Sequence, residues 1–572
     1  MNIVGISAFG QNPAACLLQN GKLMAFAEEE RFIRIKSAFG RFPLQSLKYC
    51  LSAAKISVND INLISVGWDF NKYQLKMPIF YFKQWLKYGL FKGNDSDSRV
   101  IADMITLRPR EIERQIYFNL QTLGYLKKLP KIQYISHHKA HAASSFYASG
   151  YSDALIVVLD GSGEERATTI YSGNGLDIKE LNYFTIPDSL GWLYATTTAY
   201  LGFKPYEDDG FVMGLAPYGK ENRLIKKKLK KIISYSSGKY SVNPQYTLLG
   251  KHSYSQYFSD KFTELLGKHR LSTEPMNTRF KNIAFAVQKN LEETVLSIVQ
   301  GNINSLEKRN LCLAGGVALN CKMNGEIIKS GLIDDIFVQP ASNDAGTALG
   351  AAMLASIENN FDPRFSMDHC RWGPEYSAEQ IKKSLDGAMF SYKKIRNIEG
   401  KVAELIAKGK IVARFEGRME VGPRALGGRS ILANPCIKGM NNKINNKVKH
   451  RDPWRPFCPS IIKDSVNLYL ENKLEDRFMT IIYEVKKAKI NKISSVVHVD
   501  GTTRPQSVEK EVDPKYYSLI KKVGEYTDNP VVLNTSFNVK GEPIVCSPND
   551  ALRCFSSCGI DAMAIGDFLV QK

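Results

Sequence analysis

The sequence predicts a two-domain chain of the α/β and α+β classes, in which a larger domain with duplicated halves precedes a smaller α/β domain. A pattern of strand, turn, strand, turn and strand occurs twice, from residue 2 and again from residue 153. Two later segments each run from an apolar strand through a glycine turn into a helix. Since 572 residues exceed what one hydrophobic core usually serves, a second domain is expected after these elements.

Each copy of the repeated unit combines apolar strands with an Asn-Gly turn. The first copy reads NIVGISAF, AACLLQ and KLMAFAEE, with a turn at Asn20-Gly21. The second reads DALIVVLDGSGEERATTIYSGNGLDIKELNYF, with a glycine turn over residues 160–163 and an Asn-Gly turn at Asn174-Gly175. The pair resembles the duplicated halves of the actin, Hsp70 and sugar-kinase ATPase (ASKHA) fold, whose glycine turns approach phosphates. Gly161 and Gly163 are therefore candidate nucleotide contacts.

The elements that follow complete the first domain. Residues from about 75 to 130, between the two copies, have helical spacing of apolar positions and are expected to form an insert that could cap a substrate cleft. The segment LCLAGGVALNCKMNGEI places Gly315, Gly316 and Asn320 where a strand turns into a helix, a position suited to phosphate. Prolines and the lack of a clear period over 358–377 indicate the linker, so the domains are predicted as 1–357 and 378–572.

Composition limits the class of protein. The start MNIVGISAFG has no features of a signal peptide, and no run of about 18 apolar residues occurs, so a cytoplasmic protein without a membrane span is expected. Ten cysteines without CxxC pairs predict free thiols and no structural zinc, with Cys554 and Cys558 on one helix face. The net charge of +20 is compatible with nucleic acid, an acidic glycan, a membrane surface or phosphorylated substrates, although dispersed lysines favour a solvated surface.

A cluster of histidines indicates a metal site. Three of the eight histidines lie within residues 137–141, and a helix there would place His137 and His141 one turn apart on one face. Asp160 and Asp344 stand where strands run into turns, so their carboxylates can converge on the imidazoles. Two imidazoles with one or two carboxylates suit Fe, Mn or Zn. The alternative is a hydrogen-bonded histidine pair with aspartates that only shape turns, and the combined pattern favours a metal or phosphate site.

A second cluster, of cationic residues, indicates an anion pocket in the second domain. Glycine- and proline-rich turns between 417 and 460 carry Arg418, Arg424, Arg429, Lys449, Arg451 and Arg455. Further donors follow at Arg504, Asn534, Ser536 and Asn538. Arginines in rigid turns suit bidentate phosphate binding, and no Walker A sequence is present. A salt-bridge network and a nucleic-acid groove are the alternatives, but apart from Trp454 no stacking residues are interleaved, which favours a nucleotide or acyl-phosphate pocket.

Motifs along the whole chain resemble the NodU, CmcH and TobZ type O-carbamoyltransferases, which modify nodulation factors, aminoglycosides and other natural products. The matching motifs are FAEEERFIRIK, HHKAHAASSFY, VLDGSGEE, SLGWLYATTTAYLG, MGLAPYG, AGGVALNCKMNG, SNDAGTALGAA, EVGPRALGGRSIL, WRPFCPSI, TRPQSV and LNTSFNVKGEPIV. This resemblance implies an N-terminal domain like TsaD, with the actin-like ATPase fold, and a C-terminal domain like YrdC.

The resemblance also implies a two-step reaction. In the YrdC-like domain, carbamoyl phosphate is cleaved and the carbamate attacks ATP, giving carbamoyl-adenylate and pyrophosphate. The TsaD-like domain then transfers the carbamoyl group to a hydroxyl of a small-molecule or glycan acceptor, and AMP leaves. By motif, the metal ligands are His137, His141, Asp160 and Asp344; the carbamoyl phosphate and ATP pocket comprises Arg418, Arg424, Arg429, Lys449, Arg455, Arg504, Asn534 and Ser536. The implied cofactors are Mg with ATP and a divalent metal, iron ahead of Mn or Zn; a homodimer is compatible, and nucleic acid is not expected.

The chain departs from the family pattern on the acceptor side. It has Gln11-Asn12-Pro13 where the family usually has His-Asp-Ala, Ser37 at a usual histidine, and Phe211 or Val212 at a common lysine. Glutamine cannot act as a general base, so an unusual acceptor, an amine or a weakened second step would each fit. The alternatives are a tRNA threonylcarbamoyl-type modification enzyme and a nucleotide-binding regulatory module with a decayed transfer site. A hydrogenase-maturation carbamoyltransferase is disfavoured because its CxxC zinc fingers and acylphosphatase module are missing.

Overall fold

The computed structural model describes residues 1–88, 106–127, 130–247, 257–303, 309–471 and 475–572 and divides the chain into two compact units. Unit 1 comprises Met1–Met24 and Phe39–Ser366, and unit 2 comprises Ala25–Ala38 and Met367–Lys572. The division after Ser366 falls inside the segment expected to be the linker. The short segment Ala25–Ala38, which the sequence assigned to the first domain, packs with unit 2 because its charged side chains bond to loops of that unit.

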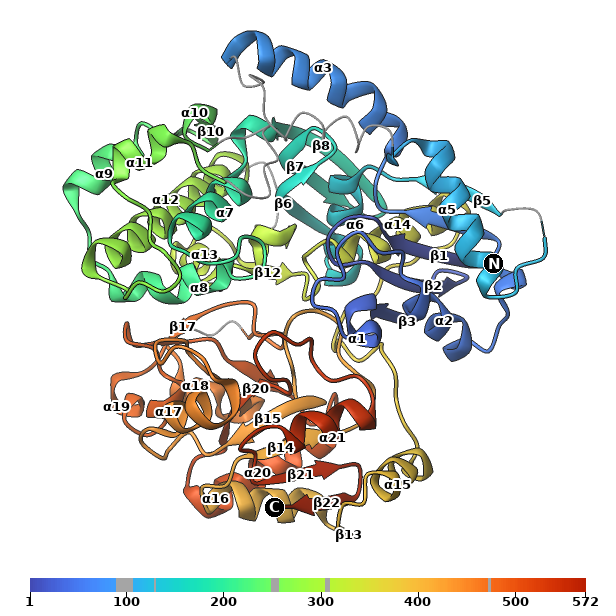
Figure 1. Cartoon of the computed structure of the whole chain (residues 1–572), viewed down its shortest axis with the longest axis vertical. Helices are drawn as coiled ribbons and strands as arrows, with labels where there is room; N and C mark the ends of the chain where they lie inside the picture. The colour runs from blue at the N-terminus through green and yellow to red at the C-terminus, as the bar shows by residue number, and fades with distance from the viewer. Residues whose placement is uncertain (89–105, 128–129, 248–256, 304–308, 472–474) are drawn as a thin grey trace. The chain divides into compact units, whose positions relative to one another are not determined.

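Unit 1 contains two five-stranded sheets with the same plan (Figure 1). The first has the order β3-β2-β1-β4-β5 and is formed by β1 (Asn2–Ser7), β2 (Ala14–Gln19), β3 (Lys22–Glu28), β4 (Leu63–Val66) and β5 (Lys131–Tyr134). The division between the units falls within β3, after Met24. The second has the order β12-β11-β6-β7-β8 and is formed by β6 (Asp153–Gly163), β7 (Arg166–Asn174), β8 (Asp177–Thr185), β11 (Asn310–Ala314) and β12 (Asp335–Val338). In both sheets the first strand pairs antiparallel with the second and parallel with the fourth. The predicted duplication of the actin-like plan is thereby confirmed.

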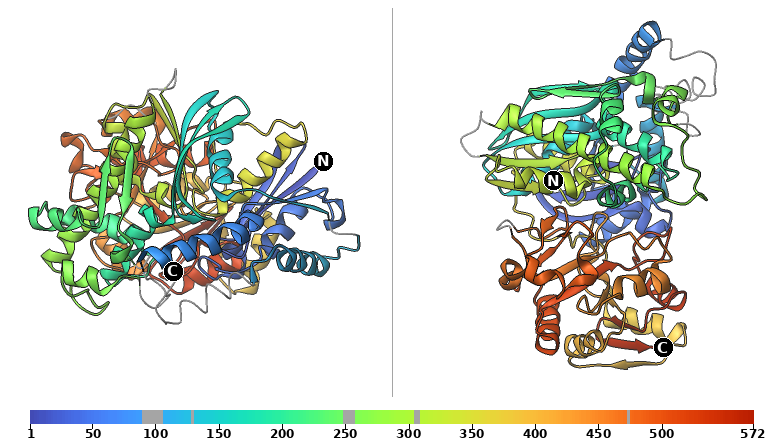
Figure 2. Two further views of the ribbon diagram at one scale, coloured as in Figure 1. Left: turned by 90° about the horizontal axis from the view of Figure 1, so that it is seen from above. Right: turned by 90° about the vertical axis from the view of Figure 1, so that its left-hand side faces the viewer.

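Helices α6 (His137–Ser149) and α14 (Ala345–Glu358) lie between the two sheets, as the views in Figures 1 and 2 show. Helix α14 packs on β1 and β2, α6 packs on β6 and β11, and the two helices pack on each other. Their contact is close because a Cβ atom at Gly350 would lie 1.8 Å from the carbonyl oxygen of Ala140. Small residues thus allow the two helices that carry candidate site residues to approach each other.

The other helices of unit 1 surround this centre. The predicted insert contains α3 (Phe70–Tyr88) and α5 (Pro109–Thr122), and its residues 89–105 and 128–129 lie outside the described residues. The longer helices elsewhere are α2 (Leu44–Ala53), α7 (Leu190–Tyr200), α12 (Thr278–Ile303) and α13 (Cys321–Lys329). Shorter ones are α8 (Asp209–Leu215), α9 (Arg223–Leu229), α10 (Pro244–Thr247) and α11 (Asp260–Leu266), beside the hairpin of β9 (Ile233–Ser236) and β10 (Lys239–Val242).

Unit 2 is built on an eight-stranded mixed sheet of order β13-β22-β21-β14-β15-β20-β16-β19. Its strands are β13 (Tyr392–Lys394), β14 (Val412–Phe415), β15 (Arg429–Ala433), β16 (Cys458–Ile462), β19 (Gln506–Val508), β20 (Val531–Ser536), β21 (Ala562–Ile565) and β22 (Phe568–Gln571). Helices α16 (Ile398–Ala407) and α20 (Pro514–Thr527) pack against each other and bury their apolar faces in the core. The mixed sheet agrees with the expected α/β class, and the likeness to YrdC stays a prediction.

The smaller elements of unit 2 are α1 (Glu29–Ile33), α15 (Ala378–Gly387), α17 (Met440–Ile444), α18 (Val466–Tyr469), α19 (Lys487–Ile490), α21 (Pro548–Ser556), β17 (Tyr483–Glu484) and β18 (Thr502–Thr503). All ten cysteines are free thiols, as expected, and all but Cys436 are buried. The expectation that Cys554 and Cys558 share one helix was wrong, because α21 ends at Ser556 and the Cys558 thiol instead donates to the Cys554 carbonyl, at 3.0 Å.

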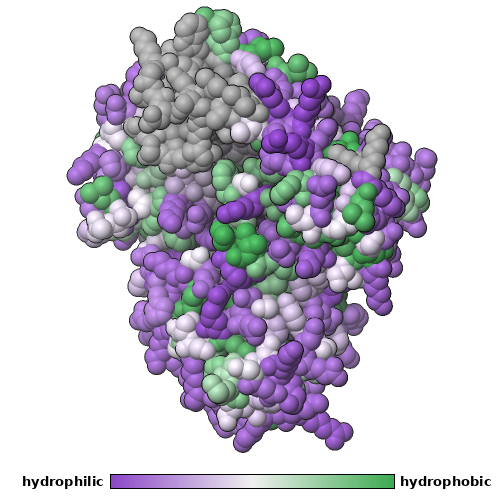
Figure 3. All heavy atoms as spheres, turned by 45° about the vertical axis from the view of Figure 1, so that its right-hand side comes forward, coloured by the Kyte–Doolittle hydropathy of each residue, from purple (hydrophilic) through white to green (hydrophobic). Residues whose placement is uncertain are grey.

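The surface is mainly hydrophilic on the face drawn in Figure 3, where apolar residues occur in small groups. This distribution agrees with the expected solvated surface of a chain that carries 77 lysines and arginines. Within the described part of the chain, no helix is both long enough and apolar enough to cross a bilayer.

Candidate functional site

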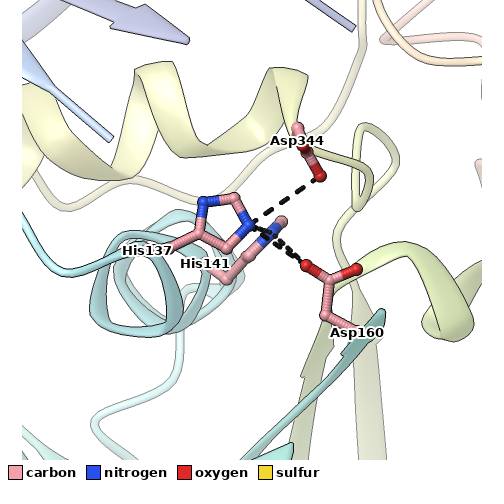
Figure 4. A group of neighbouring side chains, drawn as sticks. All are labelled: His137, His141, Asp160 and Asp344. Carbon is pink, nitrogen blue, oxygen red and sulfur yellow. Dashed lines mark hydrogen bonds and ion pairs between the residues drawn. The ribbon is translucent and has the colours of Figure 1, made fainter. Parts of the chain in front are cut away.

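Four side chains from three different segments converge at the centre of unit 1 (Figure 4). His137 and His141 project from the first turns of α6, Asp160 from the end of β6, and Asp344 from the residue that precedes α14. The two Nε2 atoms of the histidines are 3.2 Å apart. The Oδ2 atom of Asp160 lies 3.1 Å from Nε2 of His137 and 3.5 Å from Nε2 of His141, and Oδ1 of Asp344 lies 3.8 Å from Nε2 of His137.

These distances fit a divalent metal. One ligand atom from each residue can be chosen so that all lie within 4.8 Å of one another. Ligands about 2.1 Å from a first-row metal lie roughly 3.0 to 3.4 Å from each other in octahedral or tetrahedral coordination. Two imidazole nitrogens and two carboxylate oxygens suit Fe, Mn or Zn. The cluster could therefore hold a metal ion, and its convergence is what the sequence predicted.

Neighbouring groups orient the ligand His137. Its Nδ1 atom lies 3.0 Å from the carbonyl oxygen of Gly67, so Nδ1–H donates there and Nε2 is the ring nitrogen that would give up its proton to bind an ion in the cluster. The carboxylate of Glu164 accepts the backbone N–H groups of His137, at 3.0 Å, and Asp69, at 2.8 Å. The Trp68 ring packs 4.8 Å from the His137 ring, centroid to centroid. Glu164 was not among the predicted site residues, although it directly follows the DGSG sequence.

The charges of the cluster are strongly coupled. Burial acts to raise the pKa of Asp160, but hydrogen bonds from His137 and His141 hold it well below its ordinary value. Burial raises the pKa of Asp344 to about 7, against the opposing effect of His137. Burial lowers the pKa of His141. Burial also acts to lower the pKa of His137, but the Asp160 hydrogen bond and the charges of Asp344, Asp160 and Glu164 together raise it to about 9. Protons and a metal therefore compete for the same atoms, so metal binding is expected to release protons.

The glycines after β6 pack against the cluster. A Cβ atom at Gly163 would lie 2.5 Å from Cδ2 of His137 and 2.6 Å from Cδ2 of His138. One at Gly161 would lie 3.0 Å from the Trp192 ring. The predicted turn over residues 160–163 was wrong in detail, because these residues continue β6 through an irregular register and the chain reverses after Gly163. The missing side chains make room for the rings of the site; contact with nucleotide stays a prediction.

The segment after β11 supports the cluster from another side. Gly315 has φ of 89°, and a Cβ atom there would lie 2.2 Å from the Leu159 carbonyl oxygen. The next N–H group, of Gly316, donates to Oδ1 of Asp160 at 3.1 Å, which leaves Oδ2 facing the histidines. Asn320 caps α13 by accepting the N–H of Met323 at 3.0 Å. Gly316 thus orients a candidate ligand, whereas Asn320 starts a helix.

Cationic side chains gather in unit 2 around Lys449. Burial lowers the pKa of Lys449 well below its ordinary value, and Arg451 and Arg455 lower it further. Burial also lowers the pKa of Arg451 to about 9, with added repulsion from Arg455 and Arg504. The Nζ atom of Lys449 donates to Asn538 Oδ1 at 2.8 Å and to Ser536 Oγ at 3.3 Å. Mutual repulsion among close cations is the condition under which an anion binds most favourably.

Other predicted residues of the second cluster bond to the protein itself. Arg429 is fully buried and donates to the carbonyl oxygens of Glu416, Gly417, Gly428 and Pro374 at 3.0–3.2 Å. Arg418 donates to the carbonyls of Trp372, at 2.8 Å, and Gly373, at 3.2 Å. Asn534 donates to Ala425 at 3.1 Å. These bonds hold the 417–428 segment, which carries the half-buried Arg424, in place.

The segment Ala25–Ala38 forms hydrogen bonds to the 417–428 segment and to residues 543–544. The sequence did not predict it as part of the anion pocket. The Arg31 guanidinium donates to the Gly422 carbonyl at 2.7 Å, and the Glu28 carboxylate accepts the Gly422 N–H at 3.1 Å. Glu28 and Arg31 also pair with each other at 2.9 Å. Arg34 donates to the carbonyls of Ile544, at 2.6 Å, and Pro543, at 2.7 Å. The signal in the sequence was a dense run of charges directly after an apolar strand, where buried charges need partners.

Comparison with known proteins finds one family model for each of two parts of the chain. Residues 2–353 match the model of the carbamoyltransferase N-terminus, and residues 403–572 match that of the carbamoyltransferase C-terminus. The nodulation protein NolNO of Sinorhizobium fredii is 33% identical over 575 residues, which cover 99% of this chain and 80% of NolNO. An uncharacterized protein, sll1178, of Synechocystis is 34% identical over 606 residues, covering 100% of this chain and 97% of that protein. Nodulation protein U of Rhizobium fredii is 27% identical and covers 73% of this chain and 71% of its own length.

The two family models cover most of the chain and identify it as an enzyme of group transfer. It belongs to the carbamoyltransferase family, of the NodU and NolO type, and is an enzyme of that family.

Proposed function

We propose that the protein makes carbamoyl-adenylate from carbamoyl phosphate and ATP in unit 2 and transfers the carbamoyl group to an acceptor hydroxyl in unit 1. The acceptor is a hydroxyl of a sugar or natural product, which is the chemistry of the O-carbamoyltransferases that this chain resembles. Membership of the carbamoyltransferase family supports the group that is transferred. The two clusters, each within its own unit, support the division into two steps.

In the first step, water hydrolyses carbamoyl phosphate to carbamate and phosphate, and a carbamate oxygen then attacks the α-phosphorus of ATP. The bond between the α-phosphorus and the bridging oxygen breaks, and pyrophosphate leaves with its electron pair. Both displacements place negative charge on phosphoryl oxygens, which Lys449, Arg455 and Arg504 would stabilise, together with the Arg424 side chain. The repulsion that depresses the pKa values of Lys449 and Arg451 supports this assignment, because a bound polyanion relieves it.

Arg418, Arg429 and Asn534 would act through the loop that they hold. Their bonds to backbone carbonyls fix the 417–428 segment, so they position Arg424 in this proposal instead of touching the phosphate. Ser536 shares the Lys449 ammonium with Asn538 and would orient it.

In the second step, the acceptor oxygen attacks the carbamoyl carbon, and AMP leaves while the acceptor proton passes to a base. An iron, manganese or zinc ion held by His137, His141, Asp160 and Asp344 would polarise the carbonyl or hold the nucleotide phosphate. Asp344 is the most exposed of the four side chains, with about 20% of its surface accessible, so substrate would approach from its side. Gly161, Gly163, Gly315 and Gly316 would line the nucleotide phosphates beside it.

The observation that carries the proposal is the group of mutually repelling cations around the buried Lys449 in a carbamoyltransferase-family chain. The test measures pyrophosphate release by the full-length protein with ATP and Mg, with and without carbamoyl phosphate and without acceptor. Release that requires carbamoyl phosphate, and that Arg455→Ala reduces at least ~100-fold, is expected for loss of a charge-assisted contact made in the transition state. No release from the folded protein would favour a regulatory module, and release that Arg455→Ala leaves unchanged would refute the placement of the pocket.

A further inference from the structure

Helix α3 (Phe70–Tyr88) carries two apolar faces, of which one is buried and the other is mostly exposed among the described residues. Phe70, Tyr73 and Met77 are buried and attach the helix to unit 1. Leu75, Ile79, Phe82 and Leu86 instead have exposed fractions of 70%, 55%, 57% and 65%. We call these four side chains the outer stripe. Apolar side chains that are more than half exposed, on a helix that already has a buried face, need an explanation beyond folding.

The spacing of the outer stripe is that of one helix face. Its members follow one another after four, three and four residues, and at about 100° per residue they lie nearly opposite the buried set. Figures 1 and 2 show α3 as a long helix at the rim of its unit, which agrees with these exposures. The stripe is therefore presented outward along most of the length of the helix.

Lysines follow one edge of the outer stripe. Lys72, Lys76 and Lys83 are exposed and fall on the same flank of the helix, between the stripe and the buried face. The helix sequence FNKYQLKMPIFYFKQWLKY contains no aspartate or glutamate, although Lys72 pairs at 3.7 Å with Asp69, which directly precedes the helix. An apolar stripe beside a row of lysines, without acidic residues, is the pattern of a helix that lies in the interface of an anionic bilayer.

Charge decides between the possible occupants of this face. A second copy of the chain would bring the lysine rows of two molecules together, and each molecule already carries a net charge of +20. A nucleic acid would neutralise the lysines but would leave the four apolar side chains in water. An anionic lipid surface satisfies both features, because the acyl region accepts the apolar side chains and the headgroups attract the lysines.

The geometry points to α3 as a device that docks the protein on the surface of a membrane containing anionic lipid. The outer stripe inserts into the boundary between headgroups and acyl chains, while Lys72, Lys76 and Lys83 lie among the headgroups. The helix lies on the bilayer and does not cross it. Docking of this kind would place the enzyme where amphiphilic molecules concentrate, and it is independent of which acceptor is carbamoylated.

The test measures binding of the full-length protein to sedimented vesicles of phosphatidylcholine, alone or mixed with phosphatidylserine. We expect binding to the mixed vesicles, weak binding to phosphatidylcholine alone, and loss of binding when the salt shortens the Debye length from about 10 Å at 0.1 M to about 3 Å at 1 M. Removing the three lysines by K72A, K76A and K83A together should weaken binding about 100-fold, from about fivefold for each charge.

A second variant removes the apolar contribution and keeps the charge. L75S, I79S and F82S together should abolish binding, whereas L224S should not, although Leu224 is 62% exposed and lies beside lysines on α9. Because all these side chains are on the surface, the variants should keep the melting temperature and the pyrophosphate release of the parent. Absence of binding to the mixed vesicles, equal binding to both kinds of vesicle, or binding unchanged by the outer-stripe variant would each overturn the proposal. Self-association that the outer-stripe variant abolishes would assign the face to a second copy instead.

Discussion

Replacing the buried ion pair of Glu28 and Arg31 is expected to destabilise unit 2 in a way that depends on which partner is removed. Nη2 of Arg31 lies 2.9 Å from Oε2 of Glu28, and both side chains are about 3% exposed. Removing one member of a buried pair typically costs about 3–5 kcal/mol because the other charge is left without compensation. Glu30 lies 3.1 Å from Arg31 and would compensate part of its charge, so Glu28→Met should cost about 3 kcal/mol of unfolding free energy. Arg31→Met should cost more, since it leaves two carboxylates close together.

The double replacement separates the pair from its surroundings. Without either charge, the remaining cost is mainly the loss of the two bonds to Gly422, about 1–3 kcal/mol. The double variant should therefore cost less than the sum of the two single effects, which exceeds about 6 kcal/mol, although Glu30 also loses Arg31 as its partner. Urea unfolding of the full chain, with proteolysis of unit 2 as a second probe, measures these differences. Asp386→Ala is the matched control, because its 2.8 Å pair with Lys382 is exposed and should contribute little to stability.

Additive single effects, or single effects below about 1 kcal/mol, would contradict a buried, mutually compensating pair. The same variants also test the link to function. Since Glu28 and Arg31 hold the peptide group of Gly422, two residues before Arg424, Glu28→Met should raise the KM for carbamoyl phosphate in the pyrophosphate assay. An unchanged KM would mean that Glu28 and Arg31 stabilise unit 2 without positioning the 417–428 segment.

Three further outcomes follow from individual residues. His141→Ala should lower the metal content of purified protein while carbamoyl-phosphate-dependent pyrophosphate release continues; unchanged metal content would refute the assignment of the cluster. Gly163→Ala should also lower metal content, because its Cβ atom would lie 2.5 Å from the His137 ring, and an unaffected site would show that the ring can shift freely. Burial raises the pKa of Asp476 to about 6 from an ordinary 3.8 despite three backbone N–H donors, so the folded state binds the proton more tightly than the unfolded state. Unfolding free energy should therefore fall by up to about 3 kcal/mol as pH rises from 4 to 6. Urea titrations of Asp476→Asn should show no such decline. If the variant shows the same decline, other groups cause it.

Local features could be predicted because their causes lie within a few residues. Asn-Gly sequences indicate where both hairpins reverse. The turn at Asn20-Gly21 lies between β2 and β3 as expected, whereas the second turn falls one residue later than expected, at Gly175 and Leu176, because Asn174 still pairs with Asp177. The approach of His137 and His141 follows from one helical turn. Asp160 and Asp344 could be suggested as partners because each ends a strand-to-turn segment, but their distances depend on how α6 and α14 pack.

The roles of the arginines in unit 2 could not be predicted in the same way. In the sequence, Arg429 and Arg455 both stand in glycine- and proline-containing turns and look equally suited to phosphate. In the structure, Arg429 is fully buried and surrounded by carbonyl groups, whereas Arg455 remains partly exposed within the cation cluster. A guanidinium bonds to carbonyls or phosphates with similar geometry, so burial is what separates the two.

The sequence by itself thus determined the elements, their duplication, the family and the membership of the histidine cluster. Only the tertiary structure decided that Ala25–Ala38 packs with unit 2, that Glu164 and Gly316 orient the candidate ligands, and that α3 presents a second apolar face. The physical reason is the distance along the sequence between the residues that interact. Turns, caps and helix faces are set by neighbours a few residues away, whereas burial and the partner of a charge are set by segments hundreds of residues apart, which no local pattern records.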